Sequence, residues 1–290
     1  MRTGYVAIVG LPNVGKSTLL NRLLKQHLSI VAPKPQTTRH RILGILNGPD
    51  YQALLLDTPG ILEPKYPLQK FMKREIEEAL KDADVVVLVV DANQPLDELT
   101  PVLPALDRNK TIVALNKIDR VEKRSLLPLA EELARSGLEQ IFMISALNGD
   151  GVEDLKAAVV ALLPEGEPLF PSDQLSDRPE RFFVAEIIRE AIFNRYGAEI
   201  PYATTVEIDE FKEKPGHKDY IRATIYVERD SQKAIIIGAG GRALKKTGSI
   251  AREEIERFLG RPVYLELWVK VREKWRQNEK FIRETVYRRD

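Results

Sequence analysis

Short apolar runs alternate with amphipathic stretches along the first 165 residues of the chain. The apolar runs predict strands at residues 5–9, 42–46, 52–57, 85–91, 111–116 and 140–145. The stretches between most of them predict helices after residue 16, around 69–81 and 125–136, and from 152 to 163. This alternation predicts an α/β domain: a mainly parallel sheet with helices on both faces, in which ligands bind beyond the carboxyl ends of the strands.

The pattern changes in the second half of the chain. Residues 164–179 contain four prolines and several acids, a composition typical of a linker. The pattern beyond them predicts a helix at 182–196, strands at 204–211 and 219–228, two helical stretches around G-A-G-G, and a last strand at 263–271. We therefore expect two domains, residues 1–165 and 181–290, joined by a linker at residues 166–180.

Composition excludes several classes of protein. The 290 residues include no cysteine, which rules out disulfides, thiolate metal sites and a cysteine nucleophile and fits a reducing, intracellular setting. The N-terminus leads straight into a strand without a basic-then-apolar leader, and the longest apolar run, residues 85–90, is too short to span a bilayer. The net charge is +1, but residues 1–177 carry −4 and residues 178–290 carry +5. A nucleic-acid site should therefore be sought in the second half.

A complete phosphate-binding loop, G-L-P-N-V-G-K-S, lies between the first predicted strand and the first predicted helix. Lys16 should reach the β- and γ-phosphate oxygens, and the Ser17 hydroxyl should ligate Mg²⁺. Glycines let successive N–H groups converge on the phosphates at the positive end of the following helix. The nucleotide contacts expected here are Gly10, Leu11, Pro12, Asn13, Val14, Gly15, Lys16, Ser17 and Thr18, the last of which is more simply a helix-start residue.

D-T-P-G, which comprises Asp57, Thr58, Pro59 and Gly60, ends the third predicted strand. An aspartate there holds Mg²⁺ through water, and the Gly60 amide can bind the γ-phosphate. A threonine within residues 33–41 should supply the second protein ligand to Mg²⁺, and the residues alone leave Thr37 and Thr38 open.

The tetrad N-K-I-D at residues 116–119 predicts guanine as the base, and hence GTP and GDP as ligands. Asn116 can bridge the base and the phosphate loop, the Lys117 stem can pack over the guanine plane, and Ile118 completes the turn. The Asp119 carboxylate can accept from guanine N1–H and the exocyclic amine, which adenine does not present in this way. A backbone N–H for the guanine oxygen is expected from Ser145, Ala146 and Leu147.

Hydrolysis departs from the Ras pattern, because Ile61 stands where Ras-like enzymes carry the glutamine that orients the attacking water. Isoleucine cannot hydrogen-bond water. The chemistry must then rest on Mg²⁺, Lys16 and backbone groups, with an added cation as a further candidate, and we expect slow GTP hydrolysis. The predicted catalytic residues are Lys16, Ser17, Asp57, Gly60 and one threonine, Thr37 or Thr38.

An apolar helix end, a glycine turn and a basic helix start follow one another at residues 235–246, I-I-I-G-A-G-G-R-A-L-K-K. Glycines without side chains let a nucleic-acid backbone come close, and the helix N-terminus attracts phosphate. This segment and the α-β-β-α-α-β order around it resemble a type II KH domain, which implies an α+β fold that binds single-stranded RNA. The variable loop positions carry no charge, so Arg242 must contribute more. The RNA contacts predicted here are Ile237, Gly238, Ala239, Gly240, Gly241, Arg242, Lys245 and Lys246.

The last predicted strand alternates apolar residues with a polar face that carries Trp268, Lys270 and Arg272, which we also predict as RNA contacts. Trp268 can stack on a base there, or it can be covered by the tail or by the other domain. The basic tail from Lys270 onward fits a solvated helix or an RNA-contacting arm. His40 and His217 are interpreted as surface residues, and no zinc or hydrolase constellation is recognised.

Taken together, the motifs G-L-P-N-V-G-K-S, Q-T-T-R-H-R, D-T-P-G, N-K-I-D and S-A-L and the C-terminal region resemble the Era family of bacterial GTPases over nearly the whole length. The resemblance favours Thr38 over Thr37 as the Mg²⁺ ligand and implies that Asn13 binds a K⁺ ion that assists hydrolysis. It also implies a factor for assembly of the 30S ribosomal subunit that contacts the 3′ end of small-subunit ribosomal RNA, in the cytoplasm and with peripheral association with the membrane.

Two other functions stay open at this point. One is a structural RNA-binding protein in which the nucleotide only stabilises the fold. The other is a GTP-driven RNA-modification factor, although relatives of that kind depend on a reactive cysteine, which this chain lacks.

Overall fold

The computed structural model describes residues 1–99 and 103–288, which form two compact units. The first unit comprises Met1–Ser29, Thr38–Glu63 and Phe71–Asp177, and the second comprises Ile30–Thr37, Pro64–Lys70 and Arg178–Asp290. Each unit has its own hydrophobic core. Among the described residues, no helix combines the length and the apolar character that crossing a membrane requires.

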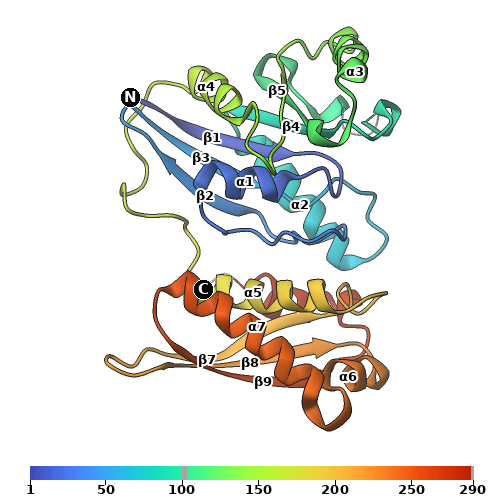
Figure 1. The fold of residues 1–290 in the computed structure, drawn as a ribbon, viewed down its shortest axis with the longest axis vertical. Helices are drawn as coiled ribbons and strands as arrows, with labels where there is room; N and C mark the ends of the chain where they lie inside the picture. The colour runs from blue at the N-terminus through green and yellow to red at the C-terminus, as the bar shows by residue number, and fades with distance from the viewer. Residues whose placement is uncertain (100–102, 289–290) are drawn as a thin grey trace. The chain divides into compact units, whose positions relative to one another are not determined.

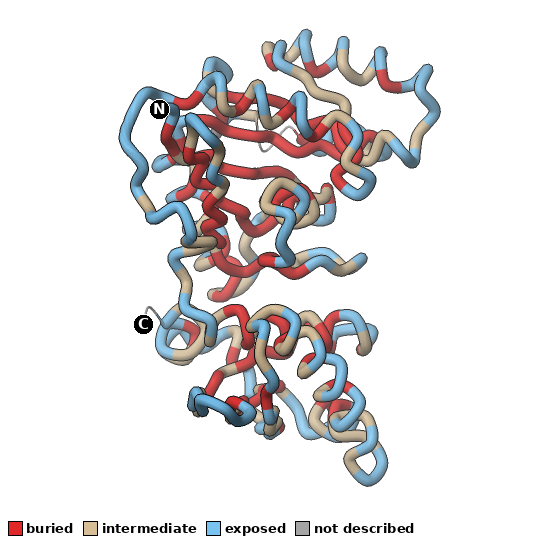
Figure 2. Tube along the Cα trace, turned by 60° about the vertical axis from the view of Figure 1, so that its left-hand side comes forward, coloured by how far each residue is buried: buried red, intermediate tan, exposed pale blue. Residues whose placement is uncertain are grey.

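The first unit is built on a six-stranded sheet in the order β2-β3-β1-β4-β5-β6 (Figure 1). Only the β2–β3 pair is antiparallel, which confirms the predicted mainly parallel α/β fold. Figure 2 shows these strands as the most continuously buried part of the unit, as their apolar runs predicted. The strands are β1 Arg2–Val9, β2 Ile42–Asn47, β3 Tyr51–Asp57, β4 Val85–Asp91, β5 Thr111–Asn116 and β6 Ile141–Met143.

Helices cover both faces of this sheet. Leucines of α1 (Lys16–Leu24) and α4 (Val152–Leu162) pack against the β1 face that carries Val6 and Ile8. Apolar residues of α2 (Pro67–Asp82) and α3 (Lys123–Arg135) join the core that contains Ala7 and Val9. Successive strand residues point to opposite faces, so one apolar strand serves both layers.

Two strands, β1 and β6, differ from the sequence prediction by more than one residue at one end. β1 begins at Arg2 rather than Tyr5, because the chain pairs with β3 from the Arg2–Tyr51 register position onward. The predicted strand 140–145 is only three residues long, since Met143 is the last residue to pair with β5 and the chain then turns toward the nucleotide motifs.

Residues 169–176, within the segment that composition marks as a linker, are hydrogen-bonded to the edge of the sheet. The buried Gln52 side chain accepts from the N–H groups of Leu169 and Phe170 at 2.7 and 3.0 Å. Further along, the Leu175 carbonyl accepts from Ile45 N at 2.9 Å. The edge strand β2 is thereby covered rather than left open to pairing with another chain.

The second unit is an α+β domain with a three-stranded sheet in the order β7-β8-β9. β7 (Thr205–Lys212) and β8 (Asp219–Val227) are antiparallel, and β9 (Val263–Val271) runs parallel to β8. The three helices α5 (Glu180–Arg195), α6 (Asp230–Ile237) and α7 (Arg242–Leu259) contribute apolar side chains to one core with the inward residues of the strands. This is the α-β-β-α-α-β order predicted for a type II KH domain.

The tail is packed, which corrects the expectation of a solvated helix. Trp275 is fully buried, and its Nε1–H donates to the Ala203 carbonyl at 2.8 Å. Ile282 is also buried, and the tail consists of short turns, Trp275–Gln277, α8 Glu279–Phe281 and Ile282–Val286, rather than one helix. A large aromatic side chain anchors this segment despite its high charge. Residues 289–290 of the predicted tail lie outside the described residues.

The two histidines named from the sequence differ in burial. His217 is exposed, as expected of a surface residue. His40 is only 6% exposed, so the expectation was wrong for it. The buried strand β2 begins two residues later, at Ile42, so the chain at His40 is already entering the interior.

Candidate functional site

The phosphate loop connects the end of β1 to the start of α1 and requires glycine at two positions. Gly10 has φ 149°, and a Cβ there would lie 2.3 Å from the Val89 carbonyl oxygen. Gly15 has φ 103°, and a Cβ there would lie 2.3 Å from Nδ2 of Asn116. At both positions the positive φ angle and the short distance to a neighbouring atom exclude a side chain, which explains why the motif has glycine there.

Lys16 lies inside its own loop and is 6% exposed. Its Nζ donates to the carbonyls of Leu11 at 2.8 Å and Gly10 at 3.2 Å. Burial lowers the pKa of Lys16 to about 8, against the opposing effect of the Asp57 carboxylate. A cation held with neutral acceptors in a buried loop is suited to an anionic ligand, whose charge would favour the protonated form.

Three oxygen-bearing side chains converge beside the loop. Ser17 Oγ donates to Asp57 Oδ2 at 2.7 Å and lies 2.9 Å from Thr38 Oγ1. Asp57 is fully buried, and burial raises its pKa although Ser17 and Lys16 oppose the shift. The other carboxylate oxygen, Asp57 Oδ1, is buried without a hydrogen-bond partner among the described residues.

This donor set fits Mg²⁺. Hydroxyl and carboxylate oxygens are the ligands that a hard cation prefers, and an orphaned buried carboxylate oxygen is the kind of atom that a cation or its water would satisfy. Within residues 1–99 and 103–288, no group of three or more His, Cys, Asp or Glu side chains forms an alternative metal site.

The D-T-P-G segment lies against the phosphate loop. A Cβ on Gly60 would come within 2.6 Å of Pro12 Cα, and Ile61 N donates to the Gly10 carbonyl at 3.1 Å. Thr58 is fully buried and its hydroxyl donates to the Ile8 carbonyl at 2.8 Å, so this side chain ties the end of β3 to β1. The Ile61 side chain packs on the hydrophobic core.

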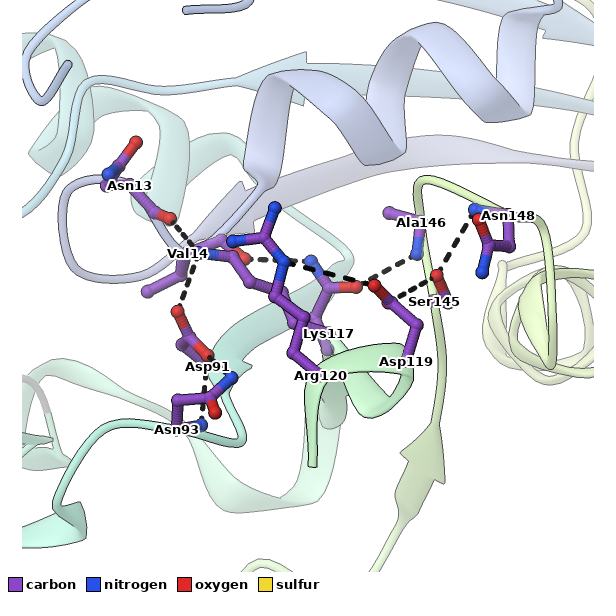
Figure 3. A network of polar contacts seen from close by, with 11 residues as sticks. Asn13, Val14, Asp91, Asn93, Lys117, Asp119, Arg120, Ser145, Ala146 and Asn148 are labelled. Carbon is purple, nitrogen blue, oxygen red and sulfur yellow. Dashed lines mark hydrogen bonds and ion pairs between the residues drawn. The ribbon is translucent and has the colours of Figure 1, made fainter. Parts of the chain in front are cut away.

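The guanine motif joins the carboxyl ends of β4, β5 and β6 (Figure 3). Asn116 Nδ2 donates to the Val14 carbonyl at 2.8 Å, and its Oδ1 accepts from Ala146 N at 2.9 Å. Asp119 Oδ1 accepts from the Ser145 hydroxyl at 2.6 Å, which orients the carboxylate. Ile118 is partly buried against the core, and Leu147 is 59% exposed.

Lys117 has a left-handed backbone, with φ 66°. Its Nζ donates at 2.6 Å both to the Asn13 carbonyl and to Asp91 Oδ2. Burial disfavours the charged form of Asp91, but hydrogen bonds from Lys117 and Asn93 outweigh it and lower the pKa of the carboxyl. The lysine stem is therefore fixed between the loop and the end of β4.

Sequence reasoning missed two residues of this site. Asp91 ends the apolar strand β4 and pairs in register with Asn116, so a carboxylate that closes an apolar run was the available signal. Arg22 Nε donates to the Ala146 carbonyl at 3.1 Å, and its Nη2 reaches the Leu147 carbonyl. Nothing in the sequence around Arg22 points to that contact.

The predicted RNA-contacting residues fall on two surfaces of the second unit. Gly238, Gly240 and Gly241 all have left-handed φ angles, between 59° and 76°, and together they form the turn before α7. A Cβ on Gly238 would come within 2.6 Å of the Ala243 Cβ, whereas Gly240 and Gly241 have no heavy atom within 4 Å of such a position. The exposed cations at the start of α7 are Arg242, Lys245 and Lys246; Ala239 is exposed as well, and Ile237 is half-buried.

Trp268, Lys270 and Arg272 lie on the other face of the sheet, since the inward residues of β9 between them pack into the helix-covered core. Trp268 is 54% exposed, so the tail does not cover it, and its Nε1–H donates to Glu266 at 2.6 Å. The Arg272 guanidinium stacks over the tail residue Phe281 at 5.4 Å from the ring centroid. The glycine turn and the β9 face are thus not one continuous surface.

Known proteins resemble the chain over both units. Residues 5–117 match a family profile described as 50S ribosome-binding GTPase, and residues 199–276 match a KH-domain profile. The chain is 47% identical over 294 residues to GTPase Era of Pseudomonas putida (strain W619), which covers 99% of this chain and 97% of that protein.

Two solved structures are similar over 99% of both chains, each with 43% identity. One, with a TM-score of 0.92, is a variant of Aquifex aeolicus Era bound to GDP and AlF4⁻. The other, with a TM-score of 0.93, is Era in complex with MgGDPNP and nucleotides 1506–1542 of 16S ribosomal RNA. Likeness of this extent covers both units and confirms the family that the motifs indicated. The chain belongs to the Era family of GTPases.

Proposed function

We propose that this GTPase is a molecular switch that binds the single-stranded 3′ end of small-subunit ribosomal RNA and acts in assembly of the 30S subunit. The observation that carries the RNA assignment is the glycine turn before α7, where nothing within 4 Å occupies the side-chain positions of Gly240 and Gly241. A nucleic-acid backbone can approach the main chain there, beside the exposed Arg242. The complex of Era with a 16S ribosomal RNA fragment supports this choice of RNA.

At the nucleotide site, different groups of the chain bind the phosphates, the base and the metal ion. The phosphate-loop amides and Lys16 bind and orient the phosphates, while Asp119, oriented by Ser145, reads guanine. Ser17, Thr38 and, through water, Asp57 hold Mg²⁺, which supplies neutralising charge to the phosphate oxygens when bound. The Gly60 backbone amide donates to the γ-phosphate of GTP.

Hydrolysis by this site is slow. The Ile61 side chain packs into the core and has no group that could orient a water molecule. Attack on the γ-phosphate therefore relies on backbone groups, Lys16 and charge neutralisation instead of a side chain that orients water. A K⁺ ion at Asn13, which is exposed at the rim of the phosphate loop, is the proposed further source of positive charge.

We place this function in the cytoplasm, where ribosomes assemble, and keep peripheral membrane contact as a separate expectation. Fractionation of cell extract tests both: the protein should sediment with ribosomal particles after membranes are removed. A share that remains on washed membranes would support the peripheral contact.

The ribosomal target is tested by co-sedimentation of the full chain with purified 30S and 50S subunits, with a GTP analogue or with GDP. We expect the 30S subunit to carry the protein down in a nucleotide-dependent manner. Binding to the 50S subunit alone would refute the proposal. A Ser17→Ala protein, impaired in Mg²⁺ coordination, serves as the control, because full nucleotide-independent binding by it would instead favour a structural RNA-binding protein.

A further inference from the structure

Residues Ile30–Thr37, which precede the Mg²⁺ ligand Thr38, belong to the second unit and are tied to helix α5. Val31 N donates to Glu190 Oε1 at 3.0 Å. Lys34 Nζ donates to the carbonyls of Phe193 and Tyr196 at the C-terminal end of the helix. A lysine there also meets the negative end of the helix dipole, so this segment is held by charge as well as by hydrogen bonds.

The deepest contact is made by Arg189, which is 2% exposed. Its Nη2 donates to the Thr37 carbonyl at 2.5 Å. Nε and Nη2 also donate to the two carboxylate oxygens of Glu186, at 2.9 and 2.6 Å, and the guanidinium lies 5.4 Å from the Phe193 ring centroid. Glu186 thus neutralises the buried charge of Arg189 and fixes the orientation of the planar guanidinium group that donates to the Thr37 carbonyl.

The carbonyl that Arg189 binds belongs to the peptide bond between Thr37 and Thr38. A peptide unit is planar, so fixing this carbonyl restricts the orientation of the Thr38 N–H and Cα. Thr38 in turn lies with its hydroxyl 2.9 Å from Ser17 Oγ. Only the backbone and side-chain torsions of Thr38 separate the anchored carbonyl from the ligand oxygen.

The backbone before this peptide is strained. Gln36 has φ 60°, a left-handed conformation that is uncommon for a residue other than glycine. Such a conformation persists when surrounding contacts impose it, and here Lys34 and Thr37 are anchored on both sides of Gln36. The anchoring contacts on α5 therefore determine the path of the chain into Thr38.

We infer that Arg189, fixed by Glu186, is a positioning residue for the Mg²⁺ ligand Thr38, and that helix α5 of the RNA-binding unit thereby sets the rate of GTP hydrolysis. This rests on the proposed role of Thr38 as a ligand. Groups that orient a metal ligand from behind typically change metal affinity or activity by about 10- to 100-fold when they are lost. By reciprocity, Mg²⁺–GTP binding that orders Thr38 must strengthen the Arg189 contact.

The test compares Arg189→Met in the full chain with Arg195→Met, a control on the same helix whose Nε donates to Thr247 and to no residue of 30–37. Single-turnover GTP hydrolysis is measured across a Mg²⁺ titration, beside GDP affinity without Mg²⁺. We expect Arg189→Met to slow hydrolysis at least tenfold and to raise the half-saturating Mg²⁺ concentration by a similar factor. GDP affinity without Mg²⁺, which depends on the guanine motif, should stay within about twofold for both variants.

Because Arg189→Met removes the cation that neutralises the buried Glu186 carboxylate, the double variant Glu186→Gln/Arg189→Met keeps the test valid if the single variant fails to fold. A double variant with wild-type hydrolysis and Mg²⁺ dependence would overturn the inference and leave the pair a structural feature of α5.

Thr38→Ala separates this result from a failure of the proposed function. If Thr38→Ala itself leaves the Mg²⁺ dependence unchanged, Thr38 is not a ligand, and the inference falls with that assignment. If Thr38→Ala has an effect, adding Arg189→Met to it should cost little more, because both changes remove the same interaction; fully additive losses would contradict action through Thr38.

Discussion

The side chain of Asn116 is hydrogen-bonded to the backbone carbonyl of Val14, 102 residues earlier in the chain, at 2.8 Å. The same amide accepts from Ala146 N at 2.9 Å, so a single buried side chain joins the phosphate loop to the two guanine-binding segments. The nucleotide site is therefore preorganised by the first residue of the guanine motif.

Asn116→Ala tests that role. The substitution leaves the Val14 carbonyl and the Ala146 N–H without their buried partner, and each lost hydrogen bond costs about 1–3 kcal/mol. We expect GDP affinity to fall by at least about 30-fold, which corresponds to roughly 2 kcal/mol. Equilibrium binding of a fluorescent GDP derivative measures it, and an affinity within threefold of the wild type would show that Asn116 does not organise the site.

Asp119→Asn should change which base is bound. The amide keeps the shape of the side chain, but it replaces an acceptor that faces the two guanine donors by a group that can donate. We expect guanine-nucleotide affinity to fall by about 100-fold or more. Xanthine nucleotides, which carry an oxygen in place of the exocyclic amine, should gain. Competition between GDP and xanthosine diphosphate measures both, and unchanged preference for guanine would contradict the assigned role of Asp119.

The added cation at Asn13 predicts a dependence on the monovalent salt. Replacement of Na⁺ by K⁺ at constant ionic strength should raise the rate of GTP hydrolysis, and Asn13→Ala should abolish the difference. The Lys117 contact uses the Asn13 carbonyl, which the substitution keeps. Equal rates in the two salts would remove K⁺ from the mechanism.

Tyr226 predicts a pH dependence of stability in the second unit. Burial, reinforced by the charge of Glu207, raises the pKa of Tyr226 to about 12, and its hydroxyl donates to Glu207 at 3.0 Å. The phenol is then protonated in the folded state over a range where the unfolded chain has already lost the proton. Its contribution is complete below the ordinary pKa of 10 and is lost as pH rises from 10 to 12.

Tyr226→Phe should therefore be less stable than the wild type at pH 8, and the difference should shrink between pH 10 and 12. Both tryptophans of the chain, Trp268 and Trp275, lie in the second unit, so fluorescence follows its urea unfolding without a signal from the first. A difference that stays constant over this pH range would show that the Tyr226 pKa is not raised.

Local patterns were sufficient for most of the fold. The predicted strands 85–91 and 263–271 are β4 and β9 with the same bounds. A strand buried on both faces, such as β4, is a continuous apolar run, whereas β9, buried on one face, alternates apolar and polar residues. The glycine positions of the phosphate loop could also be predicted from the sequence, because Gly10 and Gly15 each meet a local backbone requirement that a side chain would violate.

Contacts between segments that are distant in the sequence could not be predicted in this way. Trp275 lies in a highly charged tail, and its burial against Ala203 depends on where β7 and α5 bring that carbonyl. In the sequence, Arg189 does not differ from the other cations of its predicted helix. In the structure it is buried, and its guanidinium donates to Glu186 and to the Thr37 carbonyl. Residues of this kind acquire their role from tertiary structure, which sequence periodicity does not encode.

The glycine turn itself offers a matched pair of variants for the RNA claim. Gly240 has φ 59° and open space around it, and Asn and Asp both tolerate a left-handed backbone. Gly240→Asp adds a negative charge where a phosphate would lie, whereas Gly240→Asn adds the same bulk without the charge. Gly238 is less suitable, because a side chain there would meet Ala243.

The most direct measurement is binding of a labelled single-stranded RNA from the 3′ end of small-subunit ribosomal RNA to the wild type and both Gly240 variants. It is made with a GTP analogue, GDP or no nucleotide, at two salt concentrations. We predict nucleotide-dependent affinity that Gly240→Asp lowers at least tenfold relative to Gly240→Asn. Equally weak binding by all three proteins in every nucleotide state, collapsing with added salt, would reduce the interaction to a charged surface and contradict a GTP-dependent RNA switch.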